Sequence, residues 1–220
     1  MKVMILAAGR GERMRQLTDN CPKPLLKIAG RSIIEHLILA LKKQGFDEFV
    51  INIAYLGQQI KRALGSGEQW GVQIEYSDEG GTALETGGGI FKALPLLGKQ
   101  HFLVVNADVW TDFPYNSLMT KTDNKIHLVL VNNPLHHPGG DFSLKGGLVV
   151  SPGDKTFTYS GIGVFHPAIF AQEEPGVFPL APIIRRFISR SEVSGELLEG
   201  EWIDVGTPER LAHLATMLKA

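Results

Sequence analysis

The feature that most constrains this chain is an apolar run, Val3-Met4-Ile5-Leu6-Ala7-Ala8, that ends abruptly in Gly9-Arg10-Gly11. A short run of this kind has the length of a buried parallel strand. Glycines at the carboxyl end of such a strand let backbone N–H groups approach an anion closely. Open α/β sheets bind their ligands at that end of the strands. The sequence therefore predicts an α/β fold with a site for a phosphorylated ligand.

The spacing of this glycine loop excludes two better-known phosphate loops. Met14 stands where the dinucleotide-binding fingerprint has its third glycine. No segment matches the P-loop pattern, which ends in Lys followed by Ser or Thr. The expected ligand is phosphorylated, but it is neither NAD nor a nucleotide held by a P-loop.

Length and composition bound the remaining possibilities. The 220 residues, 44% of them hydrophobic, suffice for one substantial domain and are too few for two ordinary ones. The net charge of −1 gives no electrostatic footprint for a nucleic acid or a membrane as partner. Cys21 is the single cysteine, which fits a reducing compartment, and the apolar run before Gly9 is too short for a signal peptide or a membrane span. We expect a single cytoplasmic domain over residues 1–220 whose oligomeric state the sequence leaves open.

Strand-like and helix-like segments alternate through the first half of the chain, which indicates βα units in a mostly parallel sheet. Ser32 is expected to cap a helix that ends near Gly45. Further strands are expected at 49–54, 72–76 and 102–107, and further helices at 56–64 and 89–97, the last one broken by Pro95. After Asp108 the segments 126–131, 142–150 and 157–165 are strand-like, and helices are expected only at 181–188 and 208–218. The second half is therefore expected to insert β-structure and loops that cover the far side of the cleft.

The N-terminal motifs resemble those of the sugar-1-phosphate nucleotidylyltransferases. The resemblance rests on Leu6-Ala7-Ala8-Gly9-x-Gly11-x-Arg13-Met14-x-x-Leu17-Thr18, followed by Pro22-Lys23-Pro24-Leu25. It implies a Rossmann-like, mostly parallel central sheet flanked by helices, with a β-rich insertion that binds the sugar. It also implies a nucleotide-binding half over residues 1–110 and a sugar-binding half over 111–220. The implied substrates are a nucleoside triphosphate and a sugar 1-phosphate, and the implied cofactor is Mg²⁺.

Two aspartates are the candidate Mg²⁺ ligands. Asp108 follows an apolar strand, and Asp204 lies between Trp202-Ile203 and Val205-Gly206-Thr207-Pro208. Mg²⁺ is usually held by one or two carboxylates together with substrate phosphates and water. A strand-end turn at Asp108, and a helix start at Thr207-Pro208, are the alternative interpretations of these segments. The resemblance joins the two aspartates into one metal site.

The resemblance assigns the other site residues as follows. Arg13, whose planar fork suits two phosphate oxygens, is expected to hold the β- and γ-phosphates, and Lys23 to hold the α-phosphate or the departing bridge oxygen. These two are the candidate catalytic residues. The expected nucleotide-binding residues are Leu6, Ala7, Ala8, Gly9, Gly11, Arg13, Lys23, Thr86 and Gly87. The expected sugar-binding residues are Glu85, Gly88, Asn106, Asp141 and Gly161.

Later motifs narrow the expected substrate. Many relatives have glycine where this chain has Glu85, and a carboxylate there is expected to accept hydrogen bonds from sugar hydroxyls or an amide. Together with Asn132-Asn133-Pro134, His136-His137 and Gly140-Asp141-Phe142, it resembles the branch of the family that transfers UMP from UTP to N-acetylmuramic acid α-1-phosphate. The alternative within the family is another pair, such as GTP and mannose 1-phosphate. The alternative outside enzymes is a nucleotide-sugar sensor that binds without turnover.

Overall fold

The structure, a computed structural model, describes residues 1–218. Its strands are β1 (Val3–Leu6), β2 (Lys27–Ile28), β3 (Arg31–Ser32), β4 (Glu48–Ile53), β5 (Gln73–Asp78), β6 (Phe102–Asn106), β7 (Val109–Thr111), β8 (Ile126–Val131), β9 (Ser143–Lys145), β10 (Leu148–Val150), β11 (Thr158–Phe165), β12 (Val193–Leu197) and β13 (Trp202–Asp204). Its α-helices are α1 (Ile33–Lys43), α2 (Gly57–Leu64), α3 (Glu85–Leu97), α4 (Ala181–Ile188) and α5 (Pro208–Met217). Short 3₁₀ turns cover Glu12–Thr18, Lys23–Leu25, Glu68–Trp70, Tyr115–Thr120 and Pro167–Phe170.

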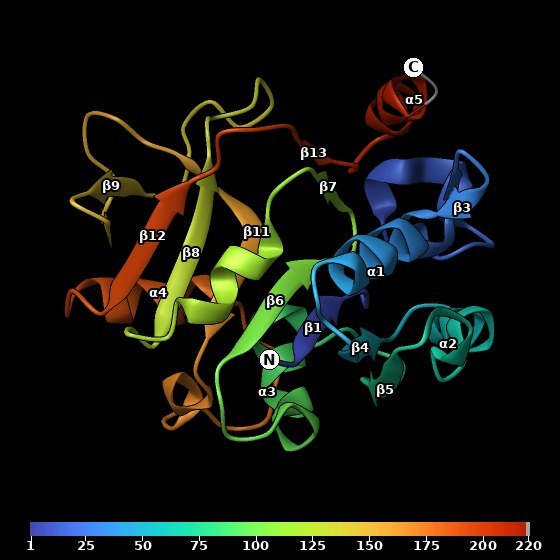
Figure 1. Ribbon diagram of the computed structural model, residues 1–220, viewed down its shortest axis with the longest axis horizontal. Coiled ribbons are helices and arrows are strands. Elements are labelled where there is room, and N and C mark those ends of the chain that lie inside the picture. The colour runs from blue at the N-terminus through green and yellow to red at the C-terminus, as the bar shows by residue number, and fades with distance from the viewer. Residues whose placement is uncertain (219–220) are drawn as a thin grey trace.

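A central mixed sheet organises the described part of the chain (Figure 1). Within residues 1–218 it has nine strands in the order β5-β4-β1-β6-β11-β8-β12-β10-β9. The first four strands are parallel to one another, β11 runs antiparallel to both of its neighbours, and β12 is parallel to β8. The parallel core flanked by helices confirms the expected Rossmann-like α/β fold.

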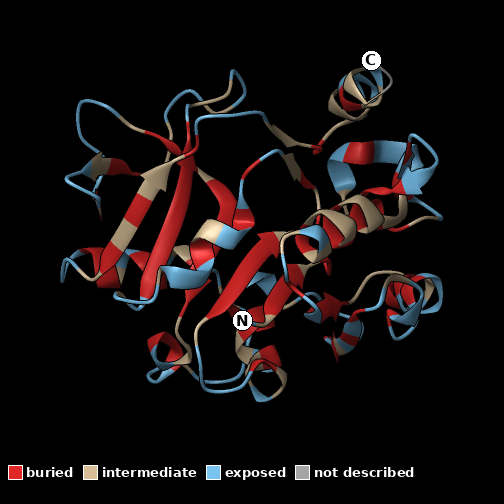
Figure 2. Ribbon diagram, viewed as in Figure 1, coloured by how far each residue is buried: buried red, intermediate tan, exposed pale blue. Residues whose placement is uncertain are grey.

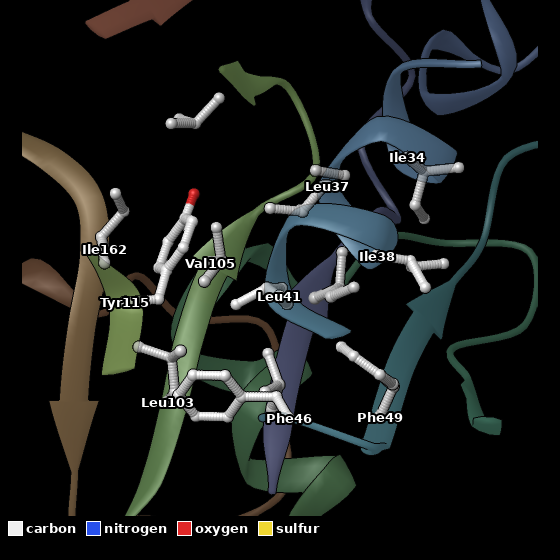
Figure 3. Packing of buried hydrophobic residues seen from close by; sticks show 14 of the residues in the cluster. Ile34, Leu37, Ile38, Leu41, Phe46, Phe49, Leu103, Val105, Tyr115 and Ile162 are labelled. Atoms are coloured by element: carbon white, nitrogen blue, oxygen red, sulfur yellow. The ribbon is translucent and has the colours of Figure 1, made fainter. Parts of the chain in front are cut away.

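Alternate side chains of the central strands build two hydrophobic cores on opposite faces of the sheet. On one face α1 packs Ile34, Leu37, Ile38 and Leu41 against inward-facing residues such as Val105 (Figure 3). On the other face α3 and α4 pack against residues such as Met4 and Val104. Figure 2 shows the resulting buried stripe through the sheet. Because strands such as β1 are buried on both faces, they are apolar along their whole length.

Most expected elements are confirmed, with differences at their ends. Ser32 caps α1 in a full capping box with Glu35. The expected strand at 142–150 is instead the hairpin β9–β10, which turns at Gly146 and Gly147, both at positive φ. The expectation that Pro95 breaks the helix is wrong, because α3 continues to Leu97. Pro95 removes one intrahelical hydrogen bond, but the last turn is still closed by the Gly98 N–H, which donates to the carbonyl oxygen of Leu94 at 3.0 Å. The strand β12 and the 3₁₀ turn at Tyr115–Thr120 were not expected.

A small third layer lies outside the central sheet. The strand β13 pairs antiparallel with β7, and α5 follows directly (Figure 1). A third core cluster, which includes Ile28, Ile33, Val205 and Leu214, joins α5 to the β2–β3 hairpin and to the start of α1. The C-terminal helix is therefore packed beside the glycine loop at the N-terminus. Within residues 1–218, no helix combines the length and the apolar character needed to cross a bilayer.

Candidate active site

A cavity of about 450 Å³ opens at the carboxyl end of the parallel strands. It lies there because β1, β4 and β6 stop together, with Leu6 opposite Asn52 on one side and Asn106 on the other. Residues of the glycine loop, of α3 and of the segment after β6 form its wall. They are Leu6, Ala7, Ala8, Gly9, Gly11, Glu12, Arg13, Lys23, Pro24, Asn52, Glu79, Ala83, Glu85, Thr86, Asn106, Ala107, Asp108 and Gly206.

The glycine loop is closed by its own hydrogen bonds. The hydroxyl of Thr18 donates to the carbonyl oxygens of Gly11 and Arg15, each at 3.1 Å. Gly11 adopts φ 71°, and a Cβ there would lie 3.0 Å from the Cβ of Lys23. Glycine is therefore required at this position by both conformation and space. The loop holds the Lys23 side chain against the cavity.

Lys23 is the most buried cation at the site. It is 8% exposed, and its ammonium group forms an ion pair with the Oδ2 atom of Asp108. Burying a charge is costly unless it has a partner, and Asp108 is the partner of Lys23. Because the lysine ammonium has three donors, it retains capacity for phosphate oxygens while it contacts the carboxylate.

The β7–β13 ladder brings Asp204 beside Asp108. Asp204 is in register with Val109, and the N–H of Val205 donates to the carbonyl oxygen of Asp108 at 2.8 Å. The Oδ2 atom of Asp204 lies 3.2 Å from the guanidinium of Arg210 and 3.8 Å from the ring of His136. Its Oδ1 atom is buried without a hydrogen-bond partner in the described part of the chain. Asp108, which directly precedes β7, lines the cavity, and the ladder places the backbone of Asp204 next to that of Asp108.

This pair of carboxylates fits a hard divalent cation. The buried and unpartnered Oδ1 atom of Asp204 is an acceptor without a donor, which is the kind of atom a cation satisfies. Carboxylate oxygens are the ligands such cations prefer. Residues 1–218 contain no group of three or more His, Cys, Asp or Glu side chains arranged to hold a metal. The remaining ligands of a cation held here would be substrate phosphates and water.

The start of α3 supplies a second wall of the cavity. Glu85 and Thr86 line it, whereas Gly87 and Gly88 are buried behind it. A Cβ on Gly87 would collide with Phe178, and one on Gly88 with the carbonyl oxygen of Gly176. The structure thus places these two glycines in packing contacts. Their expected roles at the nucleotide and the sugar stay predictions.

The expected sugar-binding residues fall into two groups. Asn106 lines the cavity, and Gly161, at φ 80°, lies against the Asn106 side chain. Asp141 is not among the residues of the cavity wall. Its carboxylate accepts a hydrogen bond from the N–H of Tyr159 at 2.8 Å and lies 3.1 Å from His137. Asp141 therefore holds together the loop that follows β8. Its contact with a sugar stays a prediction.

A buried polar network beneath the cavity was missed in the sequence. The Asn52 amide accepts from the N–H of Ala7 at 2.8 Å and donates to Glu79 at 2.6 Å. Glu79 accepts in turn from the N–H of Leu84 at 2.7 Å. The network ties the glycine loop to the start of α3. Its signal in the sequence is Asn52 itself, a polar residue inside the apolar run Phe49-Val50-Ile51-Asn52-Ile53.

Comparison with known proteins defines the class of this fold and site. The family model described as "Nucleotidyl transferase" matches residues 2–138, which include the glycine loop, Lys23 and Asp108. The chain belongs to the nucleotidyl transferase family. In fold it is similar to HddC from Yersinia pseudotuberculosis complexed with GMP-PN, with a TM-score of 0.82 and 19% identity over 99% of both chains.

Two curated relatives match almost the whole chain. An N-acetylmuramate alpha-1-phosphate uridylyltransferase from Neisseria meningitidis serogroup B is 50% identical, over 100% of this chain and 99% of its own length. A protein of the same name from Caulobacter vibrioides is 33% identical, over 99% of this chain and 97% of its own length. The expected membership of the sugar-1-phosphate nucleotidylyltransferases is confirmed.

Proposed function

We propose that the protein transfers UMP from UTP to N-acetylmuramic acid α-1-phosphate and releases pyrophosphate, giving UDP-N-acetylmuramic acid. Support comes from the full-length similarity to two relatives that carry this activity in their names. The observation that carries the proposal is the ion pair of Lys23 with Asp108 in the cavity wall, next to the β7–β13 ladder that holds Asp204. This chemistry needs a phosphate-binding loop, a positively charged side chain and two carboxylates.

The reaction is an in-line displacement at phosphorus. An oxygen of the sugar phosphate forms a bond to the α-phosphorus of UTP. The bond from that phosphorus to the α,β-bridging oxygen breaks, and pyrophosphate leaves with the electron pair. No protein nucleophile is required, so the residues act by positioning the reactants and by neutralising charge.

Each charged residue has a part in this proposal. Arg13 holds the β- and γ-phosphates, and Lys23 follows the charge that develops on the bridging oxygen. Asp108 and Asp204 would hold the divalent cation, which we propose is Mg²⁺. When bound, the cation neutralises the phosphate oxygens and so lowers their repulsion of the incoming sugar phosphate.

The remaining residues are proposed to fix the substrates. Leu6, Ala7, Ala8, Gly9, Gly11, Thr86 and Gly87 surround the nucleotide. Glu85, Gly88, Asn106, Asp141 and Gly161 lie on the sugar side. The division into a nucleotide-binding half over 1–110 and a sugar-binding half over 111–220, and a cytoplasmic location, belong to the same proposal.

The experiment that tests the function is a substrate matrix. Pyrophosphate release is measured with Mg²⁺ for UTP, GTP, CTP, ATP and dTTP against the 1-phosphates of N-acetylmuramic acid, N-acetylglucosamine, glucose and mannose. Turnover confined to UTP with the muramic acid phosphate is the expected result. Preference for another pair, such as GTP with mannose 1-phosphate, would reject the substrate and retain the mechanism. Absence of turnover in every combination would favour a sensor that binds without reacting.

A further inference from the structure

Arg210 lies at the site although no motif assigns it a role. It stands in the first turn of α5, where its N–H is bonded to the capping hydroxyl of Thr207 at 3.4 Å. Its guanidinium Nη1 atom lies 3.2 Å from the Oδ2 atom of Asp204. Arg210 therefore pairs with one oxygen of the Asp204 carboxylate, which the proposed function assigns to the binding of a metal ion.

The ion pair between Arg210 and Asp204 is incomplete on both sides. The Oδ1 atom of Asp204 and the Nε atom of Arg210 are both buried, and neither has a hydrogen-bond partner in the described part of the chain. An arginine and a carboxylate can form two parallel hydrogen bonds, whereas here a single ion-pair contact, from Nη1 to Oδ2 at 3.2 Å, joins them. Buried polar groups are nearly always paired, so each unpaired atom marks capacity for another partner.

A second guanidinium lies close to the first. Gly206 is buried and lines the cavity, and a Cβ built on it would collide with the Nη2 atom of Arg210 and lie 3.1 Å from the Nη2 atom of Arg13. Two cations that converge on one point at a cavity wall repel each other unless an anion lies between them. Asp204 pairs with one of the two arginines, Arg210.

His136 holds the other side of the Arg210 guanidinium. Its ring nitrogens lie 2.7 and 3.1 Å from the Nη1 atom. An unprotonated ring nitrogen accepts a hydrogen bond from a guanidinium N–H. Arg210 is thus held beside the cavity by the His136 ring on one side and by an exchangeable carboxylate on the other.

We propose that Arg210 is a substrate-binding residue that exchanges partners during binding, an inference that rests on the proposed function. In the enzyme without metal it neutralises Asp204. When a divalent cation binds Asp204, Arg210 leaves the carboxylate because two positive charges compete for one group. It then joins Arg13 in a two-guanidinium clamp on a phosphate of the substrate, to which its planar fork is suited.

Either substrate can supply this phosphate, since the triphosphate and the sugar 1-phosphate present the same chemistry to the clamp. The steady-state constants of Arg210→Gln distinguish the two. A raised KM for UTP places the clamp on the triphosphate, and a raised KM for the sugar 1-phosphate places it on the acceptor. Unchanged values of both constants would overturn the proposal.

Binding experiments test the exchange without turnover. Mn²⁺ binding to the substrate-free protein is followed by electron paramagnetic resonance, and pyrophosphate binding is followed by calorimetry at saturating Mg²⁺. The variants are Arg210→Gln, Arg210→Lys and, as the matched control, Arg62→Gln on the exposed surface of α2. Thermal unfolding of each variant checks that it is folded. Neither probe contains a nucleoside or a sugar, so the outcome is independent of the substrate matrix that tests the proposed function.

The exchange predicts effects of opposite sign. Arg210→Gln is expected to tighten Mn²⁺ binding about threefold, because the competing cation is gone. The same variant is expected to weaken pyrophosphate binding about tenfold. Arg210→Lys keeps the charge but loses the fork, so Mn²⁺ binding should match wild type while pyrophosphate binding falls by an intermediate factor. Weaker binding of both probes by Arg210→Gln would show that Arg210 only orients Asp204 and would overturn the proposal, as would unchanged pyrophosphate binding.

Discussion

Val205 donates its backbone N–H to the carbonyl oxygen of Asp108 over 2.8 Å, and this bond joins two segments that are distant in the sequence. It extends the β7–β13 ladder, in which Asp204 faces Val109. The main chains of Asp108 and Asp204 are consequently fixed side by side, while their carboxylates contact Lys23 and Arg210. A rigid pair of this kind is what a site for a divalent cation requires.

Removal of either carboxylate tests whether the two act as one unit. Asp108→Asn and Asp204→Asn are each expected to lower the rate of pyrophosphate release by at least about 100-fold, because each removes charge that stabilises the transition state. The double variant should be little worse than the single ones, since residues that hold one cation are not additive. Asp123→Asn on the exposed surface is the matched control. If the loss of rate in the double variant equalled the product of the two single losses, the two aspartates would not share a cation.

Glu85 carries a conformation that glycine would adopt more easily. Its φ is 58°, in the left-handed region, and its side chain belongs to the cavity wall. That conformation costs a non-glycine residue roughly 1–2 kcal/mol. Glycine loses about 0.5–1 kcal/mol more backbone entropy on folding. Glu85→Gly is therefore expected to leave the free energy of unfolding unchanged or to raise it by up to about 1 kcal/mol, as measured by urea titration.

The same variant should harm function while it spares stability. If Glu85 accepts hydrogen bonds from the sugar, its loss is expected to raise the KM for the sugar 1-phosphate about tenfold. Glu85→Ala keeps a Cβ and hence the strained conformation, so it should show the kinetic loss without the gain in stability. An unchanged KM in both variants would remove Glu85 from the sugar site.

Ser32 and Glu35 form the capping box that starts α1. The Ser32 N–H donates to the Glu35 carboxylate at 2.7 Å, and the Glu35 N–H returns a bond to the Ser32 hydroxyl at 3.3 Å. Ser32→Ala is expected to lower the free energy of unfolding by about 1 kcal/mol. Urea titration measures it, with Ser151→Ala on the surface as control. A loss equal to that of the control would mean that the cap is dispensable.

The capping box also predicts an acid dependence. Burial acts to raise the pKa of Glu35, but the hydrogen bonds from Ser32 and the charges of Lys27 and His36 outweigh it and hold the pKa below 4.5. Since the folded state favours the carboxylate, its contribution is complete above pH 4.5 and is lost as the pH falls through the lower folded pKa. The difference between wild type and Ser32→Ala should therefore shrink in acid.

His127 predicts a pH dependence near neutrality. It is buried, its ring lies 2.9 Å from Ser194 and 3.3 Å from Glu196, and Lys121 pairs with that carboxylate. Burial lowers the pKa of His127 below 6.5, against the opposing charge of Glu196. The unfolded chain therefore takes up this proton first, so the contribution of His127 to stability is complete above pH 6.5 and declines as the pH falls through the lower folded pKa.

The measurement compares stability at two pH values. Between pH 7.5 and 5.0, the free energy of unfolding is expected to fall more in wild type than in His127→Gln. The extra fall is about 1 kcal/mol for each pH unit between 6.5 and the folded pKa of His127, counted within this pH range. His213→Gln, at an exposed position on α5, controls for removal of a histidine. Equal losses in wild type and His127→Gln would show that the ring is not held neutral by the fold.

The sequence predicted the parts of the structure that depend on local patterns. The strands at β1, β4 and β6 and the capped helix α1 follow from apolar runs, periodicity and Ser32. The sequence did not predict the turn at Gly146-Gly147, because the turn depends on the pairing of β9 with β10. It did not predict that α3 continues past Pro95 to Leu97, because the effect of a proline depends on where it lies in the helix. Charged and glycine motifs gave the candidate site. Asn52, Glu79 and Arg210 escaped notice because single polar residues acquire a role only when folding brings distant segments together.

The pairing of β13 with β7 makes the site depend on two distant segments of the chain. The glycine loop, Lys23 and Asp108 lie within residues 1–110, whereas Asp204 directly precedes α5, which packs against the β2–β3 hairpin. A substitution that loosens α5 would therefore separate Asp204 from Asp108 without touching the phosphate loop, so damage far from the cavity can disable the site.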